Sequence, residues 1–192
     1  MPRLRRPLAL LAALLASSGL AACGNHPDEQ ARVVHLANEG LYLRLGELTY
    51  QVQISRQLNP DDIEDRYYLK GVPAAQRQLK PNEVWFGVFM RVENATGTAL
   101  APSGDIKIVD TQEAQYRPLK LDATNDFAYR PSDAIPPNDV LPVPDSPAYD
   151  SPIRGSLLLF KLTLTTLGNR PLELEIQGNR GAPQTGVIDL DV

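Results

Sequence analysis

Residues 84–94 read VWFGVFMRVEN and have the strongest strand pattern in this chain of 192 residues. Trp85 and Phe89 lie on one face of an extended strand over these residues. The opposite face is entirely apolar and consists of Val84, Phe86, Val88, Met90 and Val92. A strand with apolar side chains on one face and large aromatics on the other is typical of the middle of a sheet covered on both sides. We therefore predict a central strand over residues 84–94.

Period-two patterns on both sides of this stretch predict further strands. They occur over residues 41–45, 48–54, 106–108, 116–121, 172–176 and 188–192, and residues 155–164 form a nearly continuous apolar run. Gly46 and the polar stretch 110–113 mark turns between neighbouring strands. Seven or eight strands with one short helix predict an all-β fold with two packed sheets.

The short helix is predicted after Asn59-Pro60, with Asn59 as its cap and Pro60 at its first position. It contains the densest carboxylate group of the chain, formed by Asp61, Asp62, Glu64 and Asp65. Their spacing lacks the central glycine and distal glutamate of a calcium-binding loop. We therefore interpret these carboxylates as helix-capping and solvated groups, with a cation site as the alternative.

Residues 122–152 contain seven prolines and no glycine. This composition predicts an extended, ordered crossing between the sheets. Long ordered loops in small domains often bind ligands, and the aromatic side chains Phe127, Tyr129 and Tyr149 are the possible contact residues. The alternative is that the segment covers an open end of the hydrophobic core.

The first 23 residues have the order of a bacterial export signal. Residues 1–7 carry three arginines, residues 8–16 form an apolar run shorter than the roughly 20 residues that span a bilayer, and residues 20–23 read LAAC. This ending resembles the lipobox of bacterial lipoproteins, whose cysteine is lipidated on sulfur and becomes the first residue after cleavage. We predict a signal peptide over residues 1–22, lipidation of Cys23, and an outward-facing location on the bacterial cell membrane. A plain transmembrane anchor is the competing interpretation.

Residues 23–39 are predicted as a flexible tether, and residues 40–192 as the folded domain. The chain has one cysteine, so it cannot form an internal disulfide. Both of its histidines, His26 and His35, lie in the predicted tether without a third ligand nearby in the sequence, so we expect no metal site there.

The charge balance argues against a nucleic-acid partner. Removing three arginines with the signal peptide from the 19 basic residues leaves 16 against 23 acidic residues, a net charge near −7. Phosphate binding requires clustered cations, and the chain contains no run of lysine or arginine. The predicted contact with the membrane is therefore the lipid on Cys23.

Four segments resemble a known family. They are residues 92–94 with the turn that follows, the hairpin at Asp110, residues 135–138 (IPPN) and residues 155–160 (GSLLLF). Together they resemble the immunoglobulin-like domains of unknown function in secreted bacterial lipoproteins, related in fold to an immunoprotective extracellular antigen of mycobacteria. The style of the whole sequence resembles actinobacterial proteins. The resemblance implies an immunoglobulin-like sandwich, and it implies neither a catalytic residue nor a cofactor. Asn138 stands where that family usually has glycine.

Three function classes follow from these patterns. The leading hypothesis is a lipid-anchored, non-catalytic binding or adaptor module of the cell envelope, with an envelope protein or a glycan as partner. An envelope hydrolase with convergent carboxylates is the rival, although the sequence contains no GxSxG, HExxH or phosphate-loop motif. A purely structural or stress-related surface protein is the third possibility.

Overall fold

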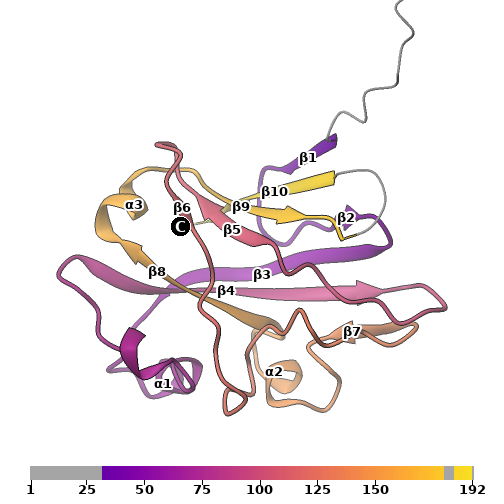
Figure 1. Ribbon diagram of the computed structural model, residues 1–192, viewed down its shortest axis with the longest axis horizontal. Helices are drawn as coiled ribbons and strands as arrows, with labels where there is room; N and C mark the ends of the chain where they lie inside the picture. The colour runs from indigo at the N-terminus through magenta and orange to yellow at the C-terminus, as the bar shows by residue number, and fades with distance from the viewer. Residues whose placement is uncertain (1–31, 180–183, 192) are drawn as a thin grey trace, which may run out of the picture.

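The computed structural model describes residues 32–179 and 184–191, which form two five-stranded sheets (Figure 1). In sheet A, β1 pairs in parallel with β10, and the remaining neighbours are antiparallel. Its strand order is β1 (Arg32–Leu36), β10 (Gln184–Leu190), β9 (Leu172–Gln177), β5 (Ile106–Val109) and β6 (Gln115–Tyr116).

Sheet B is built around β4 (Glu83–Asn94), which is its longest strand. One edge of β4 pairs with β3 (Leu48–Leu58), which in turn pairs with β2 (Leu43–Leu45). The other edge is shared by β8 (Ser156–Thr163) and β7 (Asp139–Leu141). The predicted immunoglobulin-like two-sheet sandwich is thus confirmed as a fold class.

The described residues contain ten strands, more than the seven or eight predicted. The additional strands are β1 and β7, which are five and three residues long, and the strand predicted over 116–121 is limited to β6, which ends at Tyr116. β7 is too short for a period-two pattern to identify it, and β1 has two adjacent valines where an alternating strand would have one.

The prediction for residues 84–94 is confirmed, because both faces of β4 are buried. Phe86, Val88 and Met90 belong to the main hydrophobic core. Trp85 and Phe89 point away from sheet A into a second hydrophobic cluster, which also contains Leu58, Leu157 and Tyr68. Gly155 lies so close to the backbone of Phe89 that an added Cβ would be 2.9 Å from its carbonyl carbon.

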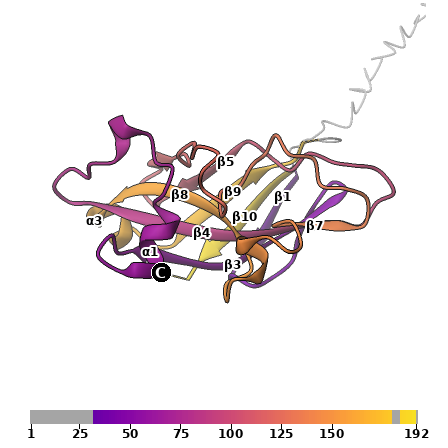
Figure 2. The same ribbon diagram turned by 90° about the horizontal axis from the view of Figure 1, so that it is seen from below.

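The second cluster is covered in part by α1 (Ile63–Tyr68), whose Tyr68 belongs to it. Figures 1 and 2 show α1 and α2 (Pro147–Asp150) on the face of sheet B opposite to sheet A, while α3 (Leu164–Gly168) follows β8. A short 3-10 helix, η1 (Ala74–Gln76), precedes β4. The Tyr68 ring of α1 meets Phe89 and Phe127 edge to face, with centroids 4.8 and 4.9 Å away.

The predicted helix start at Asn59 is wrong by three residues. The N-cap of α1 is Asp62, whose Oδ1 accepts hydrogen bonds from the backbone N–H groups of Glu64 and Asp65 at 2.8 and 3.1 Å. Asn59 instead closes a turn, because its Oδ1 accepts from the Asp61 N–H. Proline at position 60 therefore belongs to the turn before the helix.

The predicted flexible tether over residues 23–39 is wrong from Arg32 onward, because β1 adds to the edge of sheet A. The residues after β1 are also fixed: Glu39 accepts hydrogen bonds from the backbone N–H groups of Ser55 and Asp191. The predicted signal peptide, Cys23 and His26 lie outside the described residues. Within the described ranges, no helix combines the length and the apolar character that a membrane crossing needs.

The predicted turns are confirmed and are held by side chains. Asn94 is fully buried, and its amide donates to the carbonyls of Thr98, Ile135 and Pro136. Asn138 adopts a left-handed conformation with a φ of 56°. Asparagine tolerates that conformation better than most residues. Residues 122–152 are not one extended crossing, since they contain β7 and α2.

Candidate functional site

A cleft of about 390 Å³ opens along the side of the sandwich where β5 and β8 approach each other. Ile106 of β5 and Leu157 and Leu158 of β8 form its apolar floor, and residues 118–121 and 128–132 form its walls. The cleft opens beside Ile106 because β6 is too short to pair with that end of β5. Its volume lies in the range of small-molecule or side-chain binding sites.

Tyr129 fixes one wall of the cleft to the core. Its hydroxyl donates a hydrogen bond of 2.8 Å to the carbonyl of Ser103, whose N–H donates to the hydroxyl of Tyr50 at 2.9 Å. Burial raises the pKa of Tyr129 well above its ordinary value and that of Tyr50 to about 12. Both phenols are therefore neutral at physiological pH, and the Tyr129 hydroxyl is already engaged within the protein.

The backbone of both walls is tied to the free edge of β8. Leu157 donates to the carbonyl of Phe127 and accepts from the N–H of Tyr129, with distances of 2.6 and 2.9 Å. The other wall is attached where the N–H of Leu119 donates to the carbonyl of Leu159 at 2.7 Å. Because these bonds are internal to the protein, they hold both walls in place, and ligand binding requires little ordering of the chain.

The rim of the cleft is cationic. Lys120 is exposed at the rim, and Arg130 lies across from it on the other wall. One Arg130 nitrogen donates to the backbone carbonyls of Asp122 and Asn125, each at 3.0 Å, which holds the guanidinium in place. None of the described residues that line the cleft is a carboxylate or a histidine. The cleft therefore offers apolar contact and positive charge, without a carboxylate or an imidazole in its described lining.

The structure brings only one of the three predicted contact residues to this cleft, namely Tyr129. Phe127 packs into the second hydrophobic cluster against Tyr68 and has the covering role that was the alternative interpretation. Tyr149 lies half-buried on α2, away from the residues that line the cleft. Sequence reasoning missed Lys120 and Arg130, because isolated basic residues beside prolines carry no recognisable pattern.

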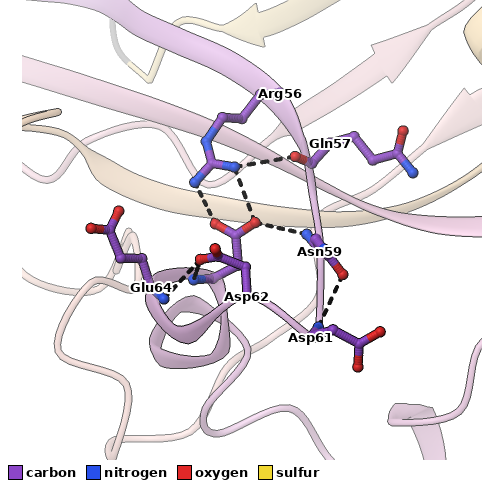
Figure 3. Close-up of polar contacts among 7 residues, drawn as sticks. Arg56, Gln57, Asn59, Asp61, Asp62 and Glu64 are labelled. Carbon is purple, nitrogen blue, oxygen red and sulfur yellow. Dashed lines mark hydrogen bonds and ion pairs between the residues drawn. The ribbon is translucent and has the colours of Figure 1, made fainter.

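Carboxylates within residues 61–65 take part in hydrogen bonds and an ion pair that hold α1 in place (Figure 3). Asp65 is buried and forms an ion pair with Arg56 of β3, with a second hydrogen bond of 3.1 Å between them. It also accepts a bond of 2.7 Å from the Asn59 N–H. Burial alone would raise the pKa of Asp65, but the Arg56 and Asn59 hydrogen bonds outweigh it and hold that pKa below its ordinary value. The prediction of solvated carboxylates is therefore wrong for Asp65, which joins α1 to β3.

His35 is not a tether residue, because it lies on β1 with half of its side chain exposed. The fold places it beside Asp189 of β10 and Glu173 of β9, two residues more than 130 positions away in the sequence. The expectation that His35 has no further ligands nearby is therefore wrong. Sequence spacing cannot reveal such a group, since three different strands contribute to it.

The comparisons with known proteins add no function to this fold. No family model matches the sequence, and no curated protein matches it. One solved structure is similar, an uncharacterized β-sandwich protein from Clostridium difficile 630, with 12% sequence identity and a TM-score of 0.47. The match covers 84% of this chain and 95% of that protein. At this low similarity we transfer no property of that protein to this chain.

Proposed function

We propose that the chain is a lipid-anchored protein of the bacterial cell envelope whose sandwich domain is a non-catalytic binding module. The observation that carries the proposal is the cleft between β5 and β8, with its apolar floor and cationic rim. The rival hydrolase with convergent carboxylates would need that pair near its substrate, and the described lining of the cleft contains no carboxylate. This chemistry favours recognition over catalysis.

The lining of the cleft also favours one class of partner. An apolar floor fits an aliphatic or aromatic side chain, and Lys120 and Arg130 attract a carboxylate next to it. A glycan needs many hydrogen-bonding side chains, whereas Ser132 is the one hydroxyl in the described lining besides the engaged Tyr129. We therefore propose a protein segment with an apolar residue beside an acidic residue as the ligand.

The proposed anchor would keep this cleft close to the membrane. Nine peptide units separate Cys23 from Arg32, where β1 begins. A chain of that length spans at most about 30 Å. With Cys23 lipidated, the β1 end of sheet A would therefore stay within one domain diameter of the lipid surface.

The anchor is tested by Cys23→Ser in the full chain, followed by separation of membrane and soluble fractions. We expect the variant to leave the membrane fraction while keeping the same thermal unfolding temperature as the natural protein. A variant that remains membrane-bound after a salt wash would contradict lipidation of Cys23.

The cleft is tested by placing a photo-crosslinking amino acid at Lys120 and, as a matched control, at Lys70, an exposed lysine just after α1. We expect a discrete crosslinked partner in the cell envelope from position 120 and none from position 70. Gly104→Leu, which fills the cleft next to Pro131, should abolish that product without unfolding the domain. Identical products from both positions, or a product that survives Gly104→Leu, would show that the cleft is not the binding surface.

A further inference from the structure

The outer face of sheet A carries a group of three potential metal ligands. His35 of β1, Asp189 of β10 and Glu173 of β9 all point away from the main core. Asp189 and Glu173 are direct register partners on antiparallel strands, and β1 continues the same sheet on the far side of β10. Hydrogen bonding between the strands therefore fixes the positions of all three backbones.

The distances between the three side chains are suitable for one small cation. His35 Nε2 lies 2.6 Å from Asp189 Oδ1, and one ligand atom from each residue lies within 4.8 Å of the other two. Ligand atoms around a tetrahedral zinc ion are separated by roughly 3.3 Å, given bonds of about 2.0–2.1 Å. Side-chain rotations alone would bring these atoms to that spacing, while the strands stay in place.

The surroundings distinguish this group from an ordinary charged surface. The neighbouring Glu175 on β9 is neutralised by Lys107 at 2.9 Å. Glu173, in contrast, forms no ion pair with a lysine or arginine among the described residues. Two carboxylates therefore face a single imidazole, and this mixed nitrogen and oxygen set is a ligand set for first-row transition metals.

We propose that His35, Glu173 and Asp189 bind a divalent transition-metal ion, with Zn²⁺ as the best-fitting example. Three protein ligands leave a fourth position for water. The ion would replace the hydrogen bond between His35 and Asp189 and connect β1, β10 and β9. Because β1 is the first described element after the predicted lipid attachment, the metal would reinforce the point at which the domain is held to its N-terminal segment.

The proposal is tested by calorimetric titration of the full-length chain in detergent with ZnCl₂ at pH 7.5, after treatment with a chelator. We expect one zinc ion per chain. His35→Ala and Glu173→Gln each remove one of the three ligands. Each variant should raise the dissociation constant for zinc at least about tenfold. Glu173→Gln keeps the size of the side chain and therefore separates metal binding from folding.

Two matched controls identify the ligands. Glu175→Gln changes the next outward-facing residue of β9, and His26→Ala removes the other histidine of the chain; neither should change the zinc affinity. Calcium should not compete, because it prefers six to eight oxygen ligands. Zinc binding that persists in both ligand variants, or that is lost with His26→Ala or Cys23→Ser, would overturn the proposal.

The pH dependence offers a second readout. The charged groups that face His35 are Asp189 from β10 and Glu173 from β9, and both favour its protonated form. A proton on the imidazole competes with the metal. We therefore expect zinc affinity to fall about tenfold between pH 7.5 and pH 5.5, because the His35 imidazole gains a proton over this interval. An affinity that does not change over this interval would contradict an imidazole ligand.

Discussion

The outer faces of the two sheets differ: that of sheet B is covered, and that of sheet A is not. The outer face of sheet B is buried beneath α1 and the 117–128 region, where Trp85, Phe89 and Leu159 form a second hydrophobic cluster. The outer face of sheet A instead carries charged side chains such as Lys107 and Glu175. Apolar burial on both faces of sheet B therefore contributes to the free energy of folding, whereas sheet A contributes through its inner face only.

The outer face of sheet B therefore contributes mainly to stability, whereas the outer face of sheet A carries accessible ionisable groups. The covered face of sheet B is closely packed, and its polar groups, such as the Arg56 and Asp65 pair, connect elements to one another. The uncovered face of sheet A leaves ionisable groups accessible to ions and protons. Substitutions on the two faces should therefore differ in size and in their dependence on pH.

The largest effect is expected from Phe89→Ala. Phe89 is fully buried in the second cluster, and loss of a core phenylalanine typically lowers the free energy of unfolding by about 3–5 kcal/mol. Urea unfolding monitored by tryptophan fluorescence measures this loss. The contrasting variant is Lys107→Ala on the outer face of sheet A, which should cost no more than about 1 kcal/mol. Equal losses from the two variants would refute the contrast between the faces.

An intermediate effect is expected from Asp65→Asn, which breaks the ion pair between α1 and β3. We expect a loss of about 2 kcal/mol at pH 7, because hydrogen bonds to a charged group are replaced by weaker ones and Arg56 is partly exposed. The pKa of Asp65 is lowered by folding, so its contribution is complete above its unfolded pKa of about 3.9.

This contribution disappears as the pH falls through the lower pKa of the folded state. The difference between the natural protein and Asp65→Asn should therefore be constant from pH 5 to 7 and shrink below pH 4. Urea unfolding over this pH series measures it, and Asp61→Asn, at an exposed position before the same helix, serves as the control. A difference that persists unchanged to pH 2 would rule out the buried carboxylate as its source.

The smallest effect is expected from His35→Gln in the presence of a chelator. The hydrogen bond to Asp189, opposed by slight burial, raises the pKa of His35 above its ordinary value of 6.5. Its contribution is therefore complete below pH 6.5 and is lost as the pH rises through the raised pKa of the folded state. We expect a difference of less than about 1 kcal/mol at pH 5.5, as for other exposed pairs, that vanishes by pH 9.

This difference is measured as the change in the free energy of unfolding between the two proteins at each pH. His26→Gln should show no such dependence if the effect belongs to the pair on β1 and β10. A larger destabilisation at pH 9 than at pH 5.5 would have the opposite sign and would exclude the pair as its origin.

Local sequence patterns were sufficient to predict the sandwich, because burial on one or both faces of a long strand produces a period-two pattern in its sequence. Residues 84–94 illustrate this, since both buried faces of β4 are visible in the alternation of its side chains. The turns at Asn94 and Asp110 were equally predictable, because asparagine and aspartate hydrogen-bond to backbone groups a few residues away. Of the proposed cleft, only Tyr129 was identified, as one aromatic residue in a proline-rich segment.

Only the tertiary structure decided what these elements bring together. β1 is a strand because β10 supplies its hydrogen-bonding partners, although its own sequence, RVVHL, shows no regular alternation of apolar and polar residues. The cleft exists because β6 ends before Ile106, and the potential metal ligands meet because three strands align in register. These features depend on contacts between residues far apart in the chain, whereas sequence patterns report on neighbours within a few residues. The sequence by itself therefore determined the sheets, and the packing of distant segments determined the sites.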